Sequence, residues 1–158
     1  MAERAGDHDN PGVLVHPPFF FLGALIVGTG LGRIWPAPIF SLVYPRIIGG
    51  IVACLGTALI VVGSRCLIAH ATNVNPTLPT KTIVCSGPYR FSRNPLYLGL
   101  TIIYFGLTLA LNTWWPLLFL LPVLLAMHFG VVRREERYLE RKFGDTYRDY
   151  CARVRRYF

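Results

Sequence analysis

Long apolar runs alternate with polar segments along most of the chain. The runs cover residues 17–35, 46–68, 95–111 and 114–132. An α-helix needs about 20 mostly apolar residues to cross the hydrocarbon core of a bilayer, and shorter runs suffice when their flanks adapt. The pattern therefore predicts an all-α integral membrane bundle of four transmembrane helices.

The acidic residues are distributed as a membrane protein requires. All eight Asp and Glu residues lie near the two ends, and none occurs between residues 10 and 132. A water-facing surface of that length would carry carboxylates, whereas a charge at the bilayer centre costs about 3 kcal/mol or more. We expect a single membrane domain over residues 17–158, preceded by a flexible cytosolic tail at 1–16.

The basic residues predict the orientation. With four spans, both termini lie on the same side as the connection between the second and third spans, and every Lys and Arg except Arg33 and Arg46 falls on that side. The positive-inside rule then places both termini in the cytosol. The net charge of +8 favours membrane lipids with anionic headgroups as partners over nucleic acid, because the basic residues flank apolar runs.

Two connections carry clear helix signals. Only Asn112 and Thr113 separate the last two apolar runs, which predicts a tight helical hairpin. The cytosolic loop 70–94 is long for a compact protein, and long loops are often functional. It ends at Asn94, a good N-cap residue, followed by Pro95 at the first helical position.

The polar C-terminus, residues 133–158, predicts a cytosolic helical segment. Residues 133–143 continue the fourth span, and Gly144 is placed to end this helix. Asp145 would cap a second short helix over residues 145–154. The apolar side of this segment would pack over the cytosolic loop or lie on the membrane surface.

One candidate site lies just before the third span. Arg90 and Arg93, beside the backbone N–H groups of a helix N-terminus, are typical of an anion site. Tyr97 shares a helix face with Arg93 if the helical turn begins early. The alternatives are that both arginines are ordinary cytosolic flanks, and that Tyr89 and Tyr97 are interfacial aromatic residues.

A second cluster follows the fourth span. Glu135 and Glu136 are the first acids after the long acid-free stretch, and they emerge at the same predicted membrane face as Arg93. A carboxylate pair there could bind a cation or hydroxyl groups, or act as a base. The alternative is an exposed helix with salt bridges to the neighbouring arginines. The common location of the two clusters favours one shared site.

These motifs resemble those of the isoprenylcysteine carboxyl methyltransferase and phospholipid methyltransferase superfamily. Its pattern comprises a GPYR stretch, an Arg-His-Pro-x-Tyr-x-Gly helix start and a Glu-Glu tail ending in spaced aromatic residues. The matching residues are Gly87, Pro88, Tyr89, Arg90, Arg93, Pro95, Tyr97, Gly99, Glu135, Glu136, Leu139, Phe143, Gly144, Tyr147 and Tyr150. Asn94 occupies the position at which many members have His, so a role that needs an imidazole is not carried over.

The resemblance implies S-adenosylmethionine as methyl donor, a lipophilic methyl acceptor and a site at the cytosolic surface. It implies that Arg93 binds the donor carboxylate, with Arg90 in reserve, and that Glu135 or Glu136 binds the ammonium group or the ribose. Arg93 and Glu136 are the candidate catalytic residues, with Glu136 as the base. The implied donor-binding residues are Ile83, Val84, Cys85, Gly87, Tyr89, Arg90, Arg93, Asn94, Tyr97, Glu135 and Glu136.

Three other functions fit the sequence less closely. Membrane sterol reductases have a similar C-terminal region, but they are much longer and use a nicotinamide cofactor. A non-catalytic membrane scaffold is a further alternative. His70 and His128, near the ends of the second and fourth spans, could ligate a membrane haem, although hydrogen bonding near the interface explains each histidine more simply. No metal motif occurs, and neither the acceptor nor the oligomeric state follows from the sequence.

Overall fold

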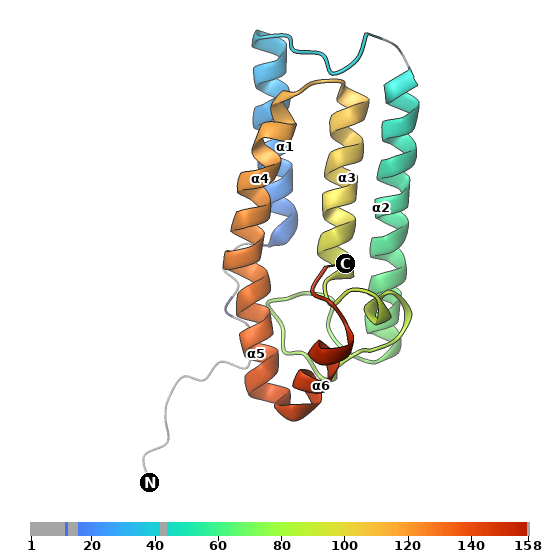
Figure 1. Cartoon of the computed structure of the whole chain (residues 1–158), viewed down its shortest axis with the longest axis vertical. Helices are drawn as coiled ribbons and strands as arrows, with labels where there is room; N and C mark the ends of the chain where they lie inside the picture. Colours follow the sequence, from blue (N-terminus) through green and yellow to red (C-terminus); the bar gives the residue numbers. More distant parts are fainter. Residues whose placement is uncertain (1–11, 13–15, 42–43, 158) are drawn as a thin grey trace.

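The computed structural model describes residue 12, residues 16–41 and residues 44–157. The four apolar runs form α1 (Pro17–Ile34), α2 (Tyr44–Ala69), α3 (Pro95–Leu111) and α4 (Trp115–Met127). These helices lie side by side, and the chain runs alternately up and down (Figure 1). The all-α fold is as predicted. The expected tail at 1–16 lies outside the described residues, apart from residues 12 and 16.

Within the described residues, three helices are long and apolar enough to cross a membrane: α1, α2 and the continuous helix Trp115–Phe143. The remaining apolar helix, α3, has only 17 residues. It cannot lengthen, because Pro95 begins it and Asn112 ends it with a left-handed φ of 51°. The structure thus contains three long candidate spans and one shorter apolar helix, where the sequence predicts four spans.

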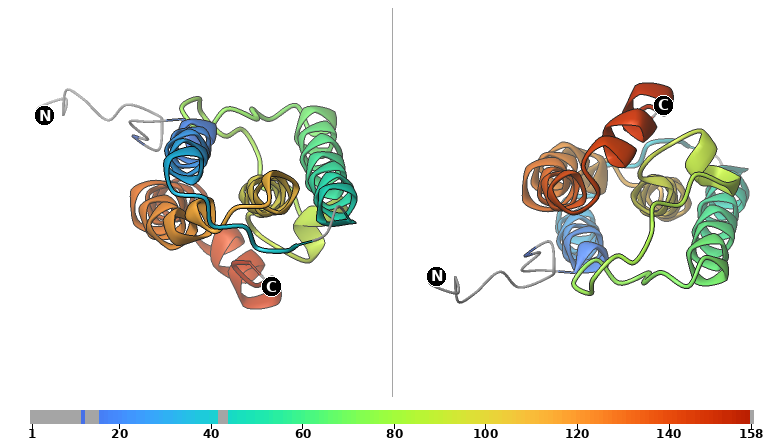
Figure 2. Two further views of the ribbon diagram at one scale, coloured as in Figure 1. Left: turned by 90° about the horizontal axis from the view of Figure 1, so that it is seen from above. Right: turned by 90° about the horizontal axis from the view of Figure 1, so that it is seen from below.

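The helices pack in two pairs, α2 with α3 and α1 with α4 (Figure 2). Glycines bring the backbones of α2 and α3 together: a Cβ added at Gly56 would lie 2.7 Å from the carbonyl oxygen of Gly99. Gly28 makes a similar approach between α1 and Pro116 of α4. Such close contact is how membrane helices associate when the solvent around them is itself apolar.

The predicted hairpin between α3 and α4 is present. The Oδ1 atom of Asn112 accepts hydrogen bonds from the backbone N–H groups of Ile39 (3.2 Å) and Phe40 (2.9 Å). Its Nδ2 atom donates to the carbonyl of Phe40 (2.8 Å). This one side chain therefore ties the hairpin to the connection between α1 and α2.

The helix that contains α4 continues out of the apolar region as predicted. A π-helical turn, η2 (His128–Val132), leads into α5 (Arg133–Phe143). Gly144, with a φ of 54°, ends α5, and α6 (Asp145–Arg153) follows. Beside α6, the loop 70–94 crosses the lower end of the bundle and contains one 3-10 turn, η1 (Gly87–Arg90).

Asn94 occupies the N-cap position of α3 and Pro95 follows it, as predicted, but the Asn94 side chain makes no cap hydrogen bond. The capping role expected for Asp145 is wrong, because Gly144 occupies the N-cap position of α6 and Asp145 is its first helical residue. The amide of Asn94 donates instead to the carbonyl of Arg156 (3.0 Å), and Asp145 pairs with Arg148 (2.6 Å). In each case the side chain bonds to this partner and not to the backbone N–H groups at the start of the helix.

The C-terminal segment packs over the loop, which was one of its two predicted positions. Tyr147, Tyr150 and Val154 form a buried cluster, against which Ile83 of the loop and Leu139 of α5 pack. The hydroxyl of Tyr150 donates to the carbonyl of Tyr89 (2.8 Å). This packing closes one side of a cavity at the lower end of the bundle.

Candidate functional site

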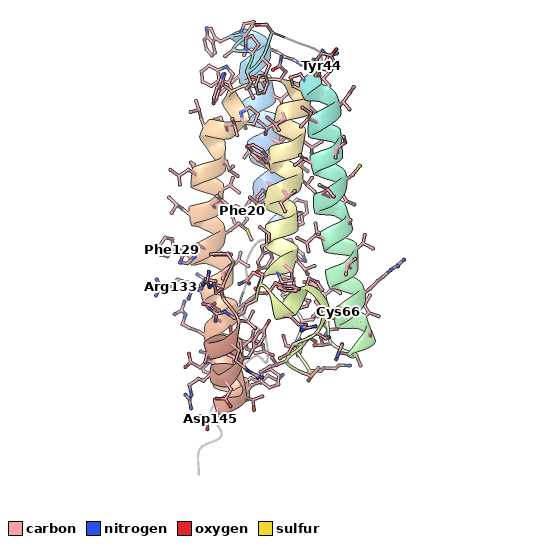
Figure 3. All side chains as sticks on the ribbon, turned by 45° about the vertical axis from the view of Figure 1, so that its right-hand side comes forward. Phe20, Tyr44, Cys66, Phe129, Arg133 and Asp145 are labelled. Carbon is pink, nitrogen blue, oxygen red and sulfur yellow. The ribbon has the colours of Figure 1, made fainter. Side chains whose placement is uncertain are left out.

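The cavity lies where the loop 70–94, the start of α3, α5 and α6 meet. Nitrogen and oxygen atoms gather at this end of the bundle, around and below the level of Arg133, whereas carbon predominates above it (Figure 3). The lining combines charged, amide, hydroxyl, aromatic and apolar groups: Leu67, Thr72, Asn73, Val74, Asn75, Pro76, Thr80, Thr82, Ile83, Val84, Tyr89, Arg93, Asn94, Pro95, Leu96, Tyr97, Glu135, Glu136, Leu139, Tyr147 and Tyr150.

The two clusters identified from the sequence share this cavity. The predicted site residues that line it are Ile83, Val84, Tyr89, Arg93, Asn94, Tyr97, Glu135 and Glu136. They come from the loop and the adjoining start of α3, and from α5, which lies much later in the chain. The folding of the loop and α5 against the start of α3 therefore creates one site of mixed charge.

Three predicted site residues lie outside the cavity lining: Cys85, Gly87 and Arg90. All three are exposed. The turn η1 explains the separation, because its tight winding buries Tyr89 while Arg90 points to solvent. Arg90 thus does not form a common anion site with Arg93.

Arg93 is the basic group of the cavity wall, and its side chain is 14% exposed. Its Nη1 atom lies 3.2 Å from Oε1 of Glu136 and also contacts Sγ of Cys151. Its Nε atom is buried and has no hydrogen-bond partner within the described part of the chain. An unpaired buried donor is costly, so this nitrogen is suited to an anionic or carbonyl ligand.

Glu136 is held by two guanidinium groups. Besides the contact with Arg93, its carboxylate receives Nε (2.9 Å) and Nη2 (2.8 Å) of Arg156, one on each oxygen. This is the bidentate geometry of a strong arginine–carboxylate pair. Arg156 belongs to the C-terminal end of the chain, and no sequence pattern marked it as part of the site.

Glu135 lies in α5, beyond the apolar part of the Trp115–Phe143 helix, and has a different environment. None of the ion pairs among the described residues involves it. Burial raises the pKa of Glu135 to about 7; the Tyr97 hydroxyl, which stabilises the carboxylate, opposes this, and the Glu136 charge adds to it. The two neighbouring carboxyl groups are thus distinct: Glu136 is paired with two guanidinium groups, whereas burial raises the pKa of Glu135 to about 7.

The tyrosines of the wall are neutral. Burial raises the pKa values of Tyr89, Tyr147 and Tyr150 well above the usual value for a phenol. Their rings give the cavity aromatic faces that can attract a cation without a competing negative charge.

Two asparagines of the loop were missed by sequence reasoning. Asn73 donates through Nδ2 to the carbonyl of Pro79 (2.6 Å). Asn75 accepts through Oδ1 from the N–H and hydroxyl groups of Thr77, both at 2.9 Å. Both residues line the cavity, and these hydrogen bonds leave the acceptor oxygen of Asn73 and the donor nitrogen of Asn75 unused. The polar run that contains them gave no spacing signal that could have identified them.

The two histidines considered as haem ligands are both hydrogen-bonded within the protein. Nδ1 of His70 lies 2.8 Å from the carbonyl oxygen of Cys66. Nδ1 of His128 lies 2.9 Å from the hydroxyl of Tyr157. These contacts match the simpler interpretation of each residue.

Comparisons with known proteins point to one family. The model of the family described as phospholipid methyltransferase matches residues 44–146, which include α2, α3, α4 and both charged clusters. An uncharacterized protein of Haemophilus influenzae is 40% identical over 62 residues, covering 39% of this chain and 98% of that protein. No solved structure matches the chain.

Proposed function

The chain belongs to the phospholipid methyltransferase family, and on this premise we propose that it transfers the methyl group of S-adenosylmethionine to a lipophilic or small apolar acceptor at the cytosolic membrane surface. The observation that carries the proposal is the charge pattern of the cavity. A buried nitrogen of Arg93 lacks a partner among the described residues, and Glu135 has no basic partner among them. These are complementary to the carboxylate and ammonium groups of the donor.

The donor would be held by charge at one end. Arg93 would bind its carboxylate, and Glu135 would bind its ammonium group or a ribose hydroxyl. The donor supplies a methyl group on a positively charged sulfur. Tyr89 and Tyr97, which line the same cavity, would favour that charge through their aromatic faces.

The amide side of the cavity suits the adenine base. Adenine offers a donor amino group next to acceptor ring nitrogens. The open acceptor of Asn73 and the open donor of Asn75 form the matching pair. Apolar neighbours such as Leu67 and Leu96 would cover the faces of the base.

An acceptor that reacts as an amine or thiol must lose a proton to a base. Glu136 stays the candidate for this role, because Glu135 is engaged with the donor in this proposal. Alignment and exclusion of water would supply the remaining acceleration, which reaches about 7–11 kcal/mol in favourable systems.

We further propose that all four apolar helices span the bilayer, with both termini cytosolic. At 1.5 Å per residue, the 17 residues of α3 extend about 26 Å, which is close to the thickness of a thin hydrocarbon core. The end that carries the cavity also carries nearly all the basic residues. The cavity would then open at the cytosolic face, where a water-soluble donor and a membrane-embedded acceptor can meet.

Calorimetry with the purified full chain in detergent tests the donor site. S-adenosylhomocysteine, the product of methyl transfer, should bind, and Arg93→Ala should weaken binding by about 10- to 100-fold, the value of a charge-assisted hydrogen bond. Arg90→Ala is the matched control, because it removes the same charge three positions away but outside the cavity. The proposal fails if well-folded protein binds neither donor nor product, or if both variants weaken binding equally. Transfer of labelled methyl to a lipid extract, with mass identification of the product, would then identify the acceptor.

A further inference from the structure

After α6, residues 154–157 form a short non-helical stretch, here called the C-terminal strap. We propose that this strap positions the polar wall of the donor cavity, and that Arg156 is its main positioning residue. The inference rests on the proposed function. None of the strap residues lines the cavity, so the strap acts through residues that do.

The strap backbone is bound by the residues that immediately precede α3. The N–H of Arg93 donates to the carbonyl of Arg155 (3.0 Å). The carbonyl of Arg156 accepts from Nδ2 of Asn94 (3.0 Å) and from the hydroxyl of Ser92 (3.3 Å). Ser92, Arg93 and Asn94, three consecutive residues just before α3, therefore all donate hydrogen bonds to the strap. The N–H of Arg93 is consequently not available to a ligand.

The side chain of Arg156 fixes the acidic part of the same wall. Its Nε and Nη2 atoms lie 2.9 and 2.8 Å from the two carboxylate oxygens of Glu136. Both distances are shorter than the 3.2 Å between Nη1 of Arg93 and the same carboxylate. Glu136 is thus shared, and Arg156 supplies its shorter contacts. Without Arg156, Glu136 would depend on Arg93 alone, and Arg93 would turn toward it and away from the donor carboxylate.

Both ends of the strap are anchored. Val154 is buried in the cluster of Tyr147 and Tyr150, and the hydroxyl of Tyr157 lies 2.9 Å from Nδ1 of His128. A segment fixed at both ends can hold the guanidinium of Arg156 in one place. This explains how a residue outside the cavity can set the geometry inside it.

The position of Asn94 acquires a role from this arrangement. Its side chain is buried and donates to the strap. An amide side chain does not titrate near neutral pH, so it can donate this bond across that range. In this chain, the residue before Pro95 is therefore a strap anchor, and methyl transfer does not depend on its titration.

The test compares two ligands and three variants of the full chain in detergent. S-adenosylhomocysteine carries the amino-acid carboxylate, whereas 5′-methylthioadenosine lacks it. Arg156→Ala should weaken binding of the first ligand by about tenfold and leave binding of the second unchanged. Arg156→Lys should restore part of the loss, because it keeps the charge without the bidentate contact.

Arg155→Ala is the control within the strap. It removes the same charge one residue away, and it keeps the backbone carbonyl that Arg93 binds. It should bind both ligands as the unmodified protein does. The positioning role is wrong if Arg156→Ala weakens the binding of both ligands equally. It is also wrong if Arg155→Ala weakens binding of S-adenosylhomocysteine as much as Arg156→Ala does.

Hydrogen exchange separates failure of this inference from failure of the proposed function. The amide of Arg93, which donates to the strap, should exchange faster in Arg156→Ala than in Arg155→Ala, with no ligand present. If neither ligand binds the unmodified protein but this difference is found, the methyltransferase proposal fails and the strap still positions the cavity wall. If the exchange rates are equal, the strap does not position the wall, whichever ligands bind.

Discussion

The apolar part of the bundle and its polar lower end are held together by different means. In the apolar part, α2 and α3 meet through glycine backbones. At the lower end, hydrogen bonds join residues 61, 62 and 64 positions apart in the chain, from the part of the loop just before α3 to α6 and the strap. Lipid provides no hydrophobic force between helices, so close packing must suffice there. Buried polar groups, in contrast, each need a partner.

Substitution of Gly56 by Val should have the largest effect, because it breaks the packing of the apolar part. The new Cβ would lie 2.7 Å from the Gly99 carbonyl oxygen and 2.8 Å from the Ile103 nitrogen, and neither backbone can move aside cheaply. We expect a loss of about 3 kcal/mol or more in stability, the upper range for overpacking. Thermal unfolding in detergent measures this loss.

Gly50→Val is the matched control in the same helix, because a Cβ at Gly50 meets nothing within 4 Å. Its unfolding temperature should stay close to that of the unmodified protein. Equal destabilisation by the two substitutions would mean that glycine contact does not hold α2 and α3 together.

Glu135→Gln should have an intermediate effect, which appears only at the polar end. Because the pKa of Glu135 is about 7, its ionised fraction rises between pH 6 and pH 8. Binding of S-adenosylhomocysteine should therefore strengthen by about tenfold over that interval, as titration of one required group predicts. In Glu135→Gln the affinity should be weaker and independent of pH over that interval.

Glu135 should affect stability and ligand binding with opposite pH dependence. A carboxyl group whose pKa is raised from 4.5 to about 7 in the folded protein favours the folded state at low pH, and this contribution is lost as the pH rises through 7. Without ligand, the unmodified protein should lose stability relative to Glu135→Gln between pH 5 and pH 8. A parallel pH dependence of the two proteins would contradict the assigned pKa.

Tyr157→Phe should have the smallest effect, and it tests the link between the two regions. The hydroxyl of Tyr157 bonds to His128, at the end of the apolar part of its helix. Removal of one such hydrogen bond should cost about 1 kcal/mol. A double-mutant cycle with His128→Ala, followed by thermal unfolding, should show a coupling of the same size. Additive effects would show that the bond does not stabilise the strap.

The sequence predicted the apolar part better than the polar end. The bounds of α3 and the hairpin at Asn112 followed from apolar runs and turn residues, because lipid imposes those patterns on each segment separately. The charged residues of the cavity wall, Arg93 and Glu135, also followed from their positions beside apolar runs. The sequence could not show that Arg90 lies outside the cavity lining, because its exposure depends on the turn η1.

What the sequence by itself determined is therefore the set of apolar helices, the end of the bundle that carries the charges and the family motifs. These depend on composition over short windows and on local backbone preference. Only the tertiary structure decided that Glu136 pairs with Arg156 while Glu135 has no basic partner, and that Asn94 anchors the strap. Glu135 and Glu136 are neighbours in one helix and give the same signal in the sequence. They face different surroundings, however, and residues from distant parts of the chain determine which of them is paired.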